Sequence, residues 1–359
     1  MEIGIYGLSY SGKSVLFNLL TGIEESRDKS KTRIGSTAVP DSRLDQLVEW
    51  YKSVKKTSVH IDFYDPGIGE KSDDSLSNAQ LNPVRHLDTL ILVVRCFASD
   101  SVPHPEESID PVRDLDMIFT QFVLADLEIA TNRINRLEES LKKTPKAARE
   151  PLEREYEVLK KIHAVLDSDN PFEVPELSDA EKLAVKSYAF FSLKKYVVVG
   201  NLGDCSNEVE RGYWEKLKSE AEKRNLPVVG VNVQIELDFQ EMEPEEVSEF
   251  RESMGLDAES RDVLLRTIYN QLGLVTFYTA GPKESAARIV PEGSSAPKAA
   301  GTIHSDMEQG FIRMEVMNYE DLVKADGSEA KVKQAGAFRL EGKDYIVQDG
   351  DVVIIRFSV

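Results

Sequence analysis

The stretch that decides the fold is Gly7–Ser14, which reads GLSYSGKS and follows the apolar run MEIGIY at residues 1–6. It matches G-x-x-x-x-G-K-[ST], the pattern of a phosphate-binding loop between a strand and a helix. The apolar residues that follow the loop have helical spacing: Val15, Leu16, Leu19 and Leu20. Glycines let the backbone curl so that N–H groups face phosphate oxygens, and the helix adds the positive end of its dipole. The sequence therefore predicts an α/β fold with a nucleoside triphosphate site at its first strand.

Two side chains of this loop carry the expected phosphate chemistry. Lys13 would reach the β and γ phosphates as a point charge, and Ser14 would offer its hydroxyl to Mg²⁺. The candidate nucleotide contacts run along the loop: Ser9, Tyr10, Ser11, Gly12, Lys13, Ser14 and Val15. The alternative is a glycine-containing turn with a solvated lysine, which the strand before it and the helix after it disfavour.

Composition limits the classes of function. The chain has 359 residues, a formal net charge of −19 and two cysteines far apart in sequence, Cys96 and Cys205. This length predicts two or three domains, and the cysteines lack metal-ligand spacing, so we expect free thiols. The acidic charge argues against non-specific nucleic-acid binding, which depends on cationic surfaces. No apolar run approaches the roughly 18 residues of a membrane span, and a strand at residue 1 leaves no room for a signal peptide. We therefore expect a cytoplasmic protein without membrane contact.

A second strand, at Val59–Tyr64, delivers a carboxylate to the same edge of the expected sheet. Asp65 follows it directly, before Pro66 and Gly67, where a P-loop fold holds Mg²⁺ through a water molecule. The alternative is an Asp-Pro-Gly turn without a ligand. Ser14 and Asp65 are thus the candidate metal ligands. No glutamine follows Gly67 to orient a water molecule, so we expect any hydrolysis to be slow or to use another group for this step.

The polar residues 24–31 predict a mobile loop where the first switch of such a protein lies. A threonine there can close over Mg²⁺ and the γ phosphate, and the sequence leaves both Thr32 and Thr37 open for this role. Helical spacing then predicts a short packing helix within residues 40–51, and the apolar run Leu87–Cys96 predicts a central parallel strand.

A long helical region interrupts the alternation of strands and helices. Apolar residues step by three and four from Ala130 to Leu141, and the spacing resumes from Leu152 to Leu166 after a break at Thr144-Pro145. With the helical pattern beginning at Phe122, this predicts an antiparallel hairpin of two helices.

Two later strands bring the candidate base contacts. Residues 196–200 lead into Asn201, Leu202, Gly203 and Asp204, where guanine-specific switch proteins carry N-K-x-D. Asn201 would hold the loop in place, and the Asp204 carboxylate could accept hydrogen bonds from guanine. Leu202, in place of the lysine, could instead make an apolar contact with adenine. Asn232, near the end of the apolar run at residues 226–233 that leads into the next loop, is a further candidate contact. The alternative for residues 201–204 is an ordinary turn at the end of a strand.

The last part of the chain, from Gly273, has a different character. A Gly-Ser-Pro-Ala linker is expected at residues 294–303, followed by short strands at 311–316, 345–347 and 352–357. These features predict a small separate α+β or β-grasp-like module, and its sequence contains no catalytic constellation.

These residues together resemble the YchF family of Obg-like ATPases over essentially the whole chain. The strings that carry the resemblance are GLSYSGKS (7–14), VPDSRLDQL (39–47), DTLILVVRCF (88–97), LGLVTFYTAGPKE (272–284), AAGTIHSDMEQGFIRMEV (299–316) and LEGKDYIVQDGDVVIIRF (340–357). The resemblance implies an OBG-type G domain with a parallel sheet at residues 1–125 and 185–272. It also implies a coiled-coil hairpin at 126–184 and a TGS-like domain at 273–359. ATP or GTP as ligand, Mg²⁺ as cofactor and the ribosome as partner are implied in the same way.

The chain departs from the family pattern in its switch elements. Tyr10 stands where members have Asn, Val15 where they have Thr, and Asp204 where they have Glu. DPGIGEKS at 65–72 replaces D-I-A-G-L-V-K-G, and VNVQIE at 231–236 replaces the S-A-K-I-E type of loop. Two hypotheses follow: a ribosome-associated ATPase or GTPase of low turnover, or a nucleotide-binding interaction scaffold with lost or weak hydrolysis.

Overall fold

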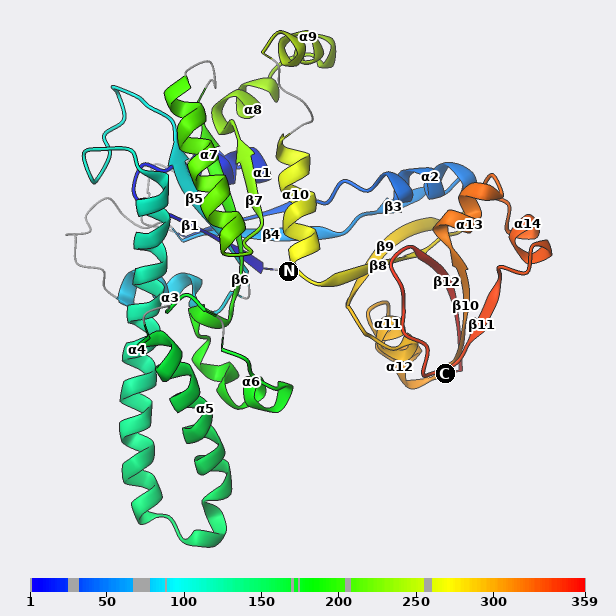
Figure 1. Cartoon of the computed structure of the whole chain (residues 1–359). Helices are drawn as coiled ribbons and strands as arrows, with labels where there is room; N and C mark the ends of the chain where they lie inside the picture. The colour runs from blue at the N-terminus through cyan, green and yellow to red at the C-terminus, as the bar shows by residue number, and fades with distance from the viewer. Residues whose placement is uncertain are drawn as a thin grey trace. The chain divides into compact units, whose positions relative to one another are not determined.

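The structure is a computed structural model that describes residues 2–24, 32–66, 78–87, 89–168, 171–173, 175–203, 208–254 and 260–358 (Figure 1). The chain forms two compact units. The N-terminal unit contains Glu2–Gly35 and Asp62–Arg261, and the C-terminal unit contains Ser36–Ile61 and Asp262–Val359. Of the helices in the described ranges, none combines the length and the apolar character that crossing a membrane requires.

A parallel sheet forms the centre of the N-terminal unit, and its strand order is β2-β4-β1-β5-β6-β7. Its strands are β1 (Glu2–Tyr6), β2 (Arg33–Ala38), β4 (His60–Asp65), β5 (Thr89–Cys96), β6 (Lys195–Leu202) and β7 (Val228–Val231). β1 pairs in parallel with β4 and with β5, β5 pairs with β6, and β6 pairs with β7. All residues of β5 are buried, as expected for a central strand covered on both faces. The predicted α/β fold with a parallel sheet is confirmed.

Helices cover this sheet and extend beyond it. They are α1 (Lys13–Thr21), α3 (Asn78–Arg85), α4 (Pro111–Lys143), α5 (Glu150–Leu166), α6 (Asp179–Val185), α7 (Glu208–Lys223), α8 (Val233–Phe239), α9 (Pro244–Met254) and α10 (Ser260–Gln271), whose later residues belong to the C-terminal unit. An aromatic cluster fixes α4 to the sheet, because Phe122 stacks on Phe191 with ring centroids 4.4 Å apart and lies 5.2 Å from Tyr6.

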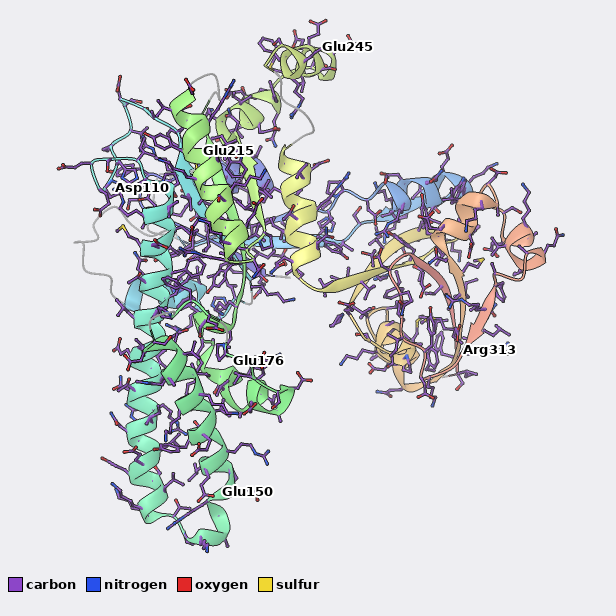
Figure 2. All side chains as sticks on the ribbon, viewed as in Figure 1. Asp110, Glu150, Glu176, Glu215, Glu245 and Arg313 are labelled. Atoms are coloured by element: carbon purple, nitrogen blue, oxygen red, sulfur yellow. The ribbon has the colours of Figure 1, made fainter. Side chains whose placement is uncertain are left out.

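The predicted helical hairpin is present as α4 and α5, which run side by side in Figure 1. Its seam is lined by buried apolar residues: Ala130, Leu137, Val158, Leu159, Ile162 and Leu166. Figure 2 labels Asp110 and Glu150 toward opposite ends of this hairpin. α4 begins at Pro111 rather than near Phe122, because the Asp110 carboxylate accepts hydrogen bonds from the N–H groups of Val112 and Arg113, both at 3.2 Å. A capping aspartate followed by proline is a strong helix start.

The C-terminal unit is built on a mixed sheet in the order β11-β10-β12-β8-β9-β3. The strands are β3 (Lys55–Thr57), β8 (Leu274–Thr279), β9 (Glu284–Pro291), β10 (Phe311–Asn318), β11 (Arg339–Glu341) and β12 (Asp351–Phe357). The helices are α2 (Ser42–Tyr51), α11 (Ala296–Gly301), α12 (Ser305–Gln309), α13 (Tyr319–Lys324) and α14 (Glu329–Gln334). β10 lies antiparallel to β12, whereas β12 pairs in parallel with β8. This arrangement fits the β-grasp-like module expected from the sequence.

Two local expectations for this unit are wrong. The linker expected at residues 294–303 contains helix α11, and Ala296, Ala299 and Ala300 in it are fully buried against the sheet. Small residues are common in flexible linkers, which is why the sequence predicts a linker here. In the structure their small size allows close packing instead. The strand expected at 345–347 is reduced to a single bridge between Ser295 and Ile346.

The segment Ser36–Ile61 packs within the C-terminal unit, although the expected boundaries place it in the nucleotide domain. Leu44 and Leu47 of α2 are buried in one core cluster with Tyr278, Met317 and Val352. Hydrogen bonds reinforce this packing: Tyr278 donates to Asp41 at 2.5 Å, and Arg43 donates to Asp349 at 2.5 Å. The C-terminal unit is therefore assembled from two distant parts of the chain.

We predict that Leu47→Ala destabilises the C-terminal unit, although residue 47 lies far from it in sequence. Leu47 is fully buried, so its truncation should cost roughly 3 kcal/mol of unfolding free energy. Hydrogen exchange of the β8 and β12 amides should accelerate accordingly. Val54→Ala is the matched control in the same segment, because Val54 is 91% exposed. Equal exchange in β8 for Leu47→Ala and the control would contradict this packing.

Candidate functional site

The loop between β1 and α1 has two glycine positions where an added side chain would collide with neighbouring atoms. A Cβ atom added at Gly7 would lie 2.3 Å from the carbonyl oxygen of Val93, and one added at Gly12 would lie 2.1 Å from Asn201 Nδ2. Gly12 also has a φ of 96° as it caps α1. Because β1 ends at Tyr6 and α1 begins at Lys13, the predicted strand, loop and helix of a phosphate-binding loop are all present.

Lys13 points back into the loop. Its Nζ donates a hydrogen bond to the carbonyl oxygen of Leu8 at 2.6 Å. Burial lowers the pKa of the Lys13 ammonium from 10.5 to about 8, although the nearby Asp65 carboxylate acts in the opposite direction. A desolvated cation with a weak neutral acceptor gains much from a phosphate group, because a charge-assisted hydrogen bond replaces a neutral one.

Ser14 and Asp65 come together as the metal hypothesis requires. The Ser14 hydroxyl donates to Asp65 Oδ2 at 3.3 Å, and Asp65 is only 4% exposed at the end of β4. A hydroxyl and a carboxylate are hard oxygen ligands, so this pair fits Mg²⁺. Since the described ranges hold no cluster of three or more Asp, Glu, His or Cys side chains suited to a metal, phosphate oxygens and water would complete the coordination.

Arg33 is a third side chain at this point, and no sequence pattern indicates its role. Its guanidinium donates a short hydrogen bond to the same Asp65 Oδ2 that accepts from Ser14. The Arg33 Cζ also lies 4.6 Å from the centre of the Phe17 ring. The preceding residue, Thr32, donates to the Pro66 carbonyl at 3.4 Å, so the structure places Thr32 beside the Asp65 segment. The other candidate, Thr37, lies in the part of β2 that belongs to the C-terminal unit.

Two asparagines connect the phosphate loop with the loops expected to hold the base. Asn201 Nδ2 donates to the Ser11 carbonyl at 2.9 Å. Asn232 donates to the Gly203 carbonyl, and its Oδ1 accepts from the Ile235 N–H at 3.2 Å as the cap of α8. Both side chains therefore act as braces that fix one loop to the next.

The remaining predicted residues have different surroundings. Ser9 and Tyr10 are exposed, Val15 is half-buried, and Leu202 packs partly against the core beside α7. Ser11 is buried, and its hydroxyl has no hydrogen-bond partner among the described residues. Asp204, Cys205, most of the segment 65–72 and most of the first-switch loop lie outside the described residues. Cys96 is fully buried, as expected.

A second residue that the sequence analysis missed is Glu210, in the first turn of α7. Its Oε1 accepts from the Ala98 N–H at 2.7 Å, and its Oε2 lies 2.3 Å from where a Cβ atom of Gly203 would be. The Glu210 side chain thus packs against Gly203, in the loop at 201–203. An acidic residue at a helix start is common in sequences, so no sequence signal distinguishes it.

We predict two opposite pH effects from Lys13. Because its folded-state pKa of about 8 is below its usual 10.5, the unfolded chain binds more protons between these values, and the stability of the ligand-free protein should rise with pH there. Triphosphate binding needs the charged form, so affinity should fall about tenfold per pH unit above pH 8. Thermal melts and fluorescent-nucleotide titrations over this window measure both effects, and Lys13→Ala should lose both. Affinity that stays constant across the window would exclude Lys13 as the responsible cation.

Known proteins of similar sequence and structure identify the family. Residues 274–358 match the family model YchF-GTPase_C, described as a protein of unknown function (DUF933). The "Ribosome-binding ATPase YchF" of Haemophilus influenzae is 39% identical, and that of Pasteurella multocida 38%, each over all of this chain and 99% of the relative. The protein of the same name from Bacillus subtilis is 36% identical over the whole of both chains.

The solved structure of the Schizosaccharomyces pombe YchF GTPase has the same fold. It matches with a TM-score of 0.84 at 24% identity and covers 99% of this chain and 97% of that one. A likeness at this identity supports the fold, and the full-length sequence matches to the curated relatives decide the family. This chain belongs to the YchF family.

Proposed function

We propose that this protein is a Mg²⁺-dependent P-loop hydrolase that binds ATP, or GTP, and turns it over slowly in the cytoplasm. The observation that carries the proposal is the curl of residues 7–14, where Gly7 and Gly12 fit no other residue and Lys13 lies inside the loop. The related proteins are named "Ribosome-binding ATPase YchF", and this name supports the same activity.

The chain's own groups divide the work in this proposal. Loop amides and the Lys13 ammonium bind and orient the β and γ phosphates, and they stabilise the charge that develops there. Ser14 and Asp65 would hold Mg²⁺, which supplies further charge neutralisation when bound. Asn201 keeps the loop in its curled form through its hydrogen bond to the Ser11 carbonyl. No general base is present among the described residues of the loop, which supports low turnover.

On the base, we predict that ATP binds at least as well as GTP. Leu202 stands where guanine-specific proteins have a lysine, and it lies half-buried at the end of β6, so an apolar contact with adenine replaces the lysine stem. Asn201, Leu202, Asp204 and Asn232 are the residues proposed around the base. Calorimetric titration with both nucleotides measures the preference. GTP binding tighter than ATP by more than about tenfold, ~1.4 kcal/mol, would contradict the prediction.

We further propose the ribosome as the partner, because the related proteins are named ribosome-binding ATPases. The net charge of −19 argues that the contact is local and directed by shape, since broad phosphate neutralisation needs a cationic surface. Co-sedimentation with ribosomes in the presence of ATP, of a non-hydrolysable analogue and of no nucleotide tests this. Binding that is lost uniformly as salt rises, also to unrelated RNA, would speak against a specific contact.

A nucleotide-binding scaffold without hydrolysis is the second candidate, favoured by the altered segment 65–72. Single-turnover release of phosphate from radiolabelled ATP and GTP separates the two. The hydrolase predicts release by the wild-type protein that Lys13→Ala lacks. Equal background release by both proteins would leave the scaffold as the function.

A further inference from the structure

The strongest unassigned feature of the site is the position of Arg33 on Asp65. The side chains of Arg33 and Asp65 are 10% and 5% exposed, so this ion pair is largely shielded from water. Arg33 Nη1 also donates to the Glu24 carbonyl at 3.3 Å, and the Phe17 ring packs against the guanidinium from one side. Arg33 is therefore held in place by a carboxylate, a carbonyl and an aromatic face together.

The oxygen that Arg33 uses is the one the metal hypothesis needs. Asp65 Oδ2 accepts from both Arg33 and the Ser14 hydroxyl, so the guanidinium lies beside the pair of oxygens that would serve Mg²⁺. A shielded carboxylate without a cation is costly, and Arg33 supplies that cation in this arrangement. A guanidinium and a metal dication on the same carboxylate oxygen would repel each other at close range.

We propose that Arg33 is a resident counter-cation that competes with Mg²⁺ for Asp65, and so raises the Mg²⁺ concentration that the protein needs. Arg33 is a positioning residue in this role, because it acts through Asp65. The inference rests on the proposed Mg²⁺-nucleotide site. Its consequence is that Asp65 has a cationic partner without the metal, and that the guanidinium must leave before Mg²⁺ or a water molecule bound to it can take that oxygen.

The test compares wild type with Arg33→Gln, and it reads metal dependence rather than activity. Fluorescent-nucleotide binding is titrated with Mg²⁺, and the half-saturating Mg²⁺ concentration should fall by about tenfold in Arg33→Gln, as loss of a competing ion pair of ordinary strength predicts. Arg33→Lys keeps the charge without the planar fork, so its midpoint should fall less. A midpoint that is unchanged or raised in Arg33→Gln overturns the proposal. A merely structural role would weaken nucleotide binding at every Mg²⁺ concentration without lowering the midpoint.

A second measurement needs no nucleotide. Mg²⁺ alone should raise the melting temperature of Arg33→Gln, whose Asp65 lacks the guanidinium, more than it raises that of the wild type at the same Mg²⁺ concentration. If no nucleotide binds to either protein, the proposed function fails while this melt still decides the role of Arg33. An equal Mg²⁺ response of both proteins in the melt overturns the inference by itself.

Arg85→Gln is the matched control. Arg85 also pairs with a buried carboxylate, Asp126 Oδ1 at 3.1 Å, and lies over a phenylalanine ring, Phe191, at 4.3 Å. Its loss should lower stability without changing the Mg²⁺ midpoint or creating a Mg²⁺ response in the melt. A midpoint that shifts equally in Arg85→Gln and Arg33→Gln would show a general effect of losing a buried arginine, and would overturn the proposal.

Discussion

Replacing Lys13 with alanine should lower triphosphate affinity by about 100-fold, or ~3 kcal/mol, the upper value for a hydrogen bond between charged groups. The reason is that Lys13 already lies inside the loop, with its Nζ on the Leu8 carbonyl at 2.6 Å, so little ordering is needed before it meets phosphate. The loss should be larger for the triphosphate than for the monophosphate, because Lys13 is expected to reach the β and γ groups. Isothermal titration calorimetry with ATP, ADP and AMP measures the loss of affinity for each nucleotide.

Lys194→Ala is the control for this experiment. Lys194 is another half-buried lysine of the N-terminal unit, and its Nζ donates to the Leu87 carbonyl at 2.5 Å. It lies immediately before β6, at the opposite end of that strand from Asn201. Its replacement removes the same kind of charge and hydrogen bond, so affinity for ATP should stay as in the wild type. A similar loss of affinity in both variants would mean that the effect of Lys13→Ala is not local to the loop.

Gly12→Ala should both abolish triphosphate binding and lower stability. The new Cβ atom would lie 2.1 Å from Asn201 Nδ2, so Asn201 must move and release the Ser11 carbonyl. The φ of 96° at Gly12 adds backbone strain, and together the two effects should cost roughly 3 kcal/mol. Denaturant unfolding measures the stability, and nucleotide titration measures the binding.

Gly22→Ala separates strain from collision. Gly22 also has a positive φ, 70°, as the cap at the end of α1, but an added Cβ atom meets nothing within 4 Å. It should therefore lose only about 1 kcal/mol and keep nucleotide binding. The double variant Gly12→Ala with Asn201→Ala should recover part of the stability, because the colliding amide is gone. A double variant that is no more stable than Gly12→Ala alone would exclude the collision as the cause.

The architecture could be predicted from sequence where local patterns are strong. The loop at 7–14 has a fixed spacing, the run at 89–96 is wholly buried, and the hairpin repeats its apolar steps over many turns. Each of these depends on contacts close in sequence or on one well-defined period. The helix start at Pro111 was also available in the sequence, since Asp110 before a proline is a capping signal.

The parts that sequence reasoning missed depend on contacts between distant residues. The composition of α11 predicts a linker because alanine, proline and glycine are common in flexible segments, yet its alanines are buried by β-strands far along the chain. Arg33 and Glu210 are ordinary charged residues until the fold brings Asp65 and Gly203 beside them. Their roles come from tertiary position, which neither composition nor periodicity reports.

The C-terminal unit is built from two separate segments of the chain, and this limits how the protein can be shortened. Because α2 and β3 come from residues 42–57 and pack with strands after residue 273, a stop codon near residue 272 would not leave a smaller intact protein. It would leave the apolar side of α2 bare, a liability for aggregation. A division of the chain at residue 273 therefore cuts through one core, and any shortened version must keep residues 36–61 together with the last part of the chain.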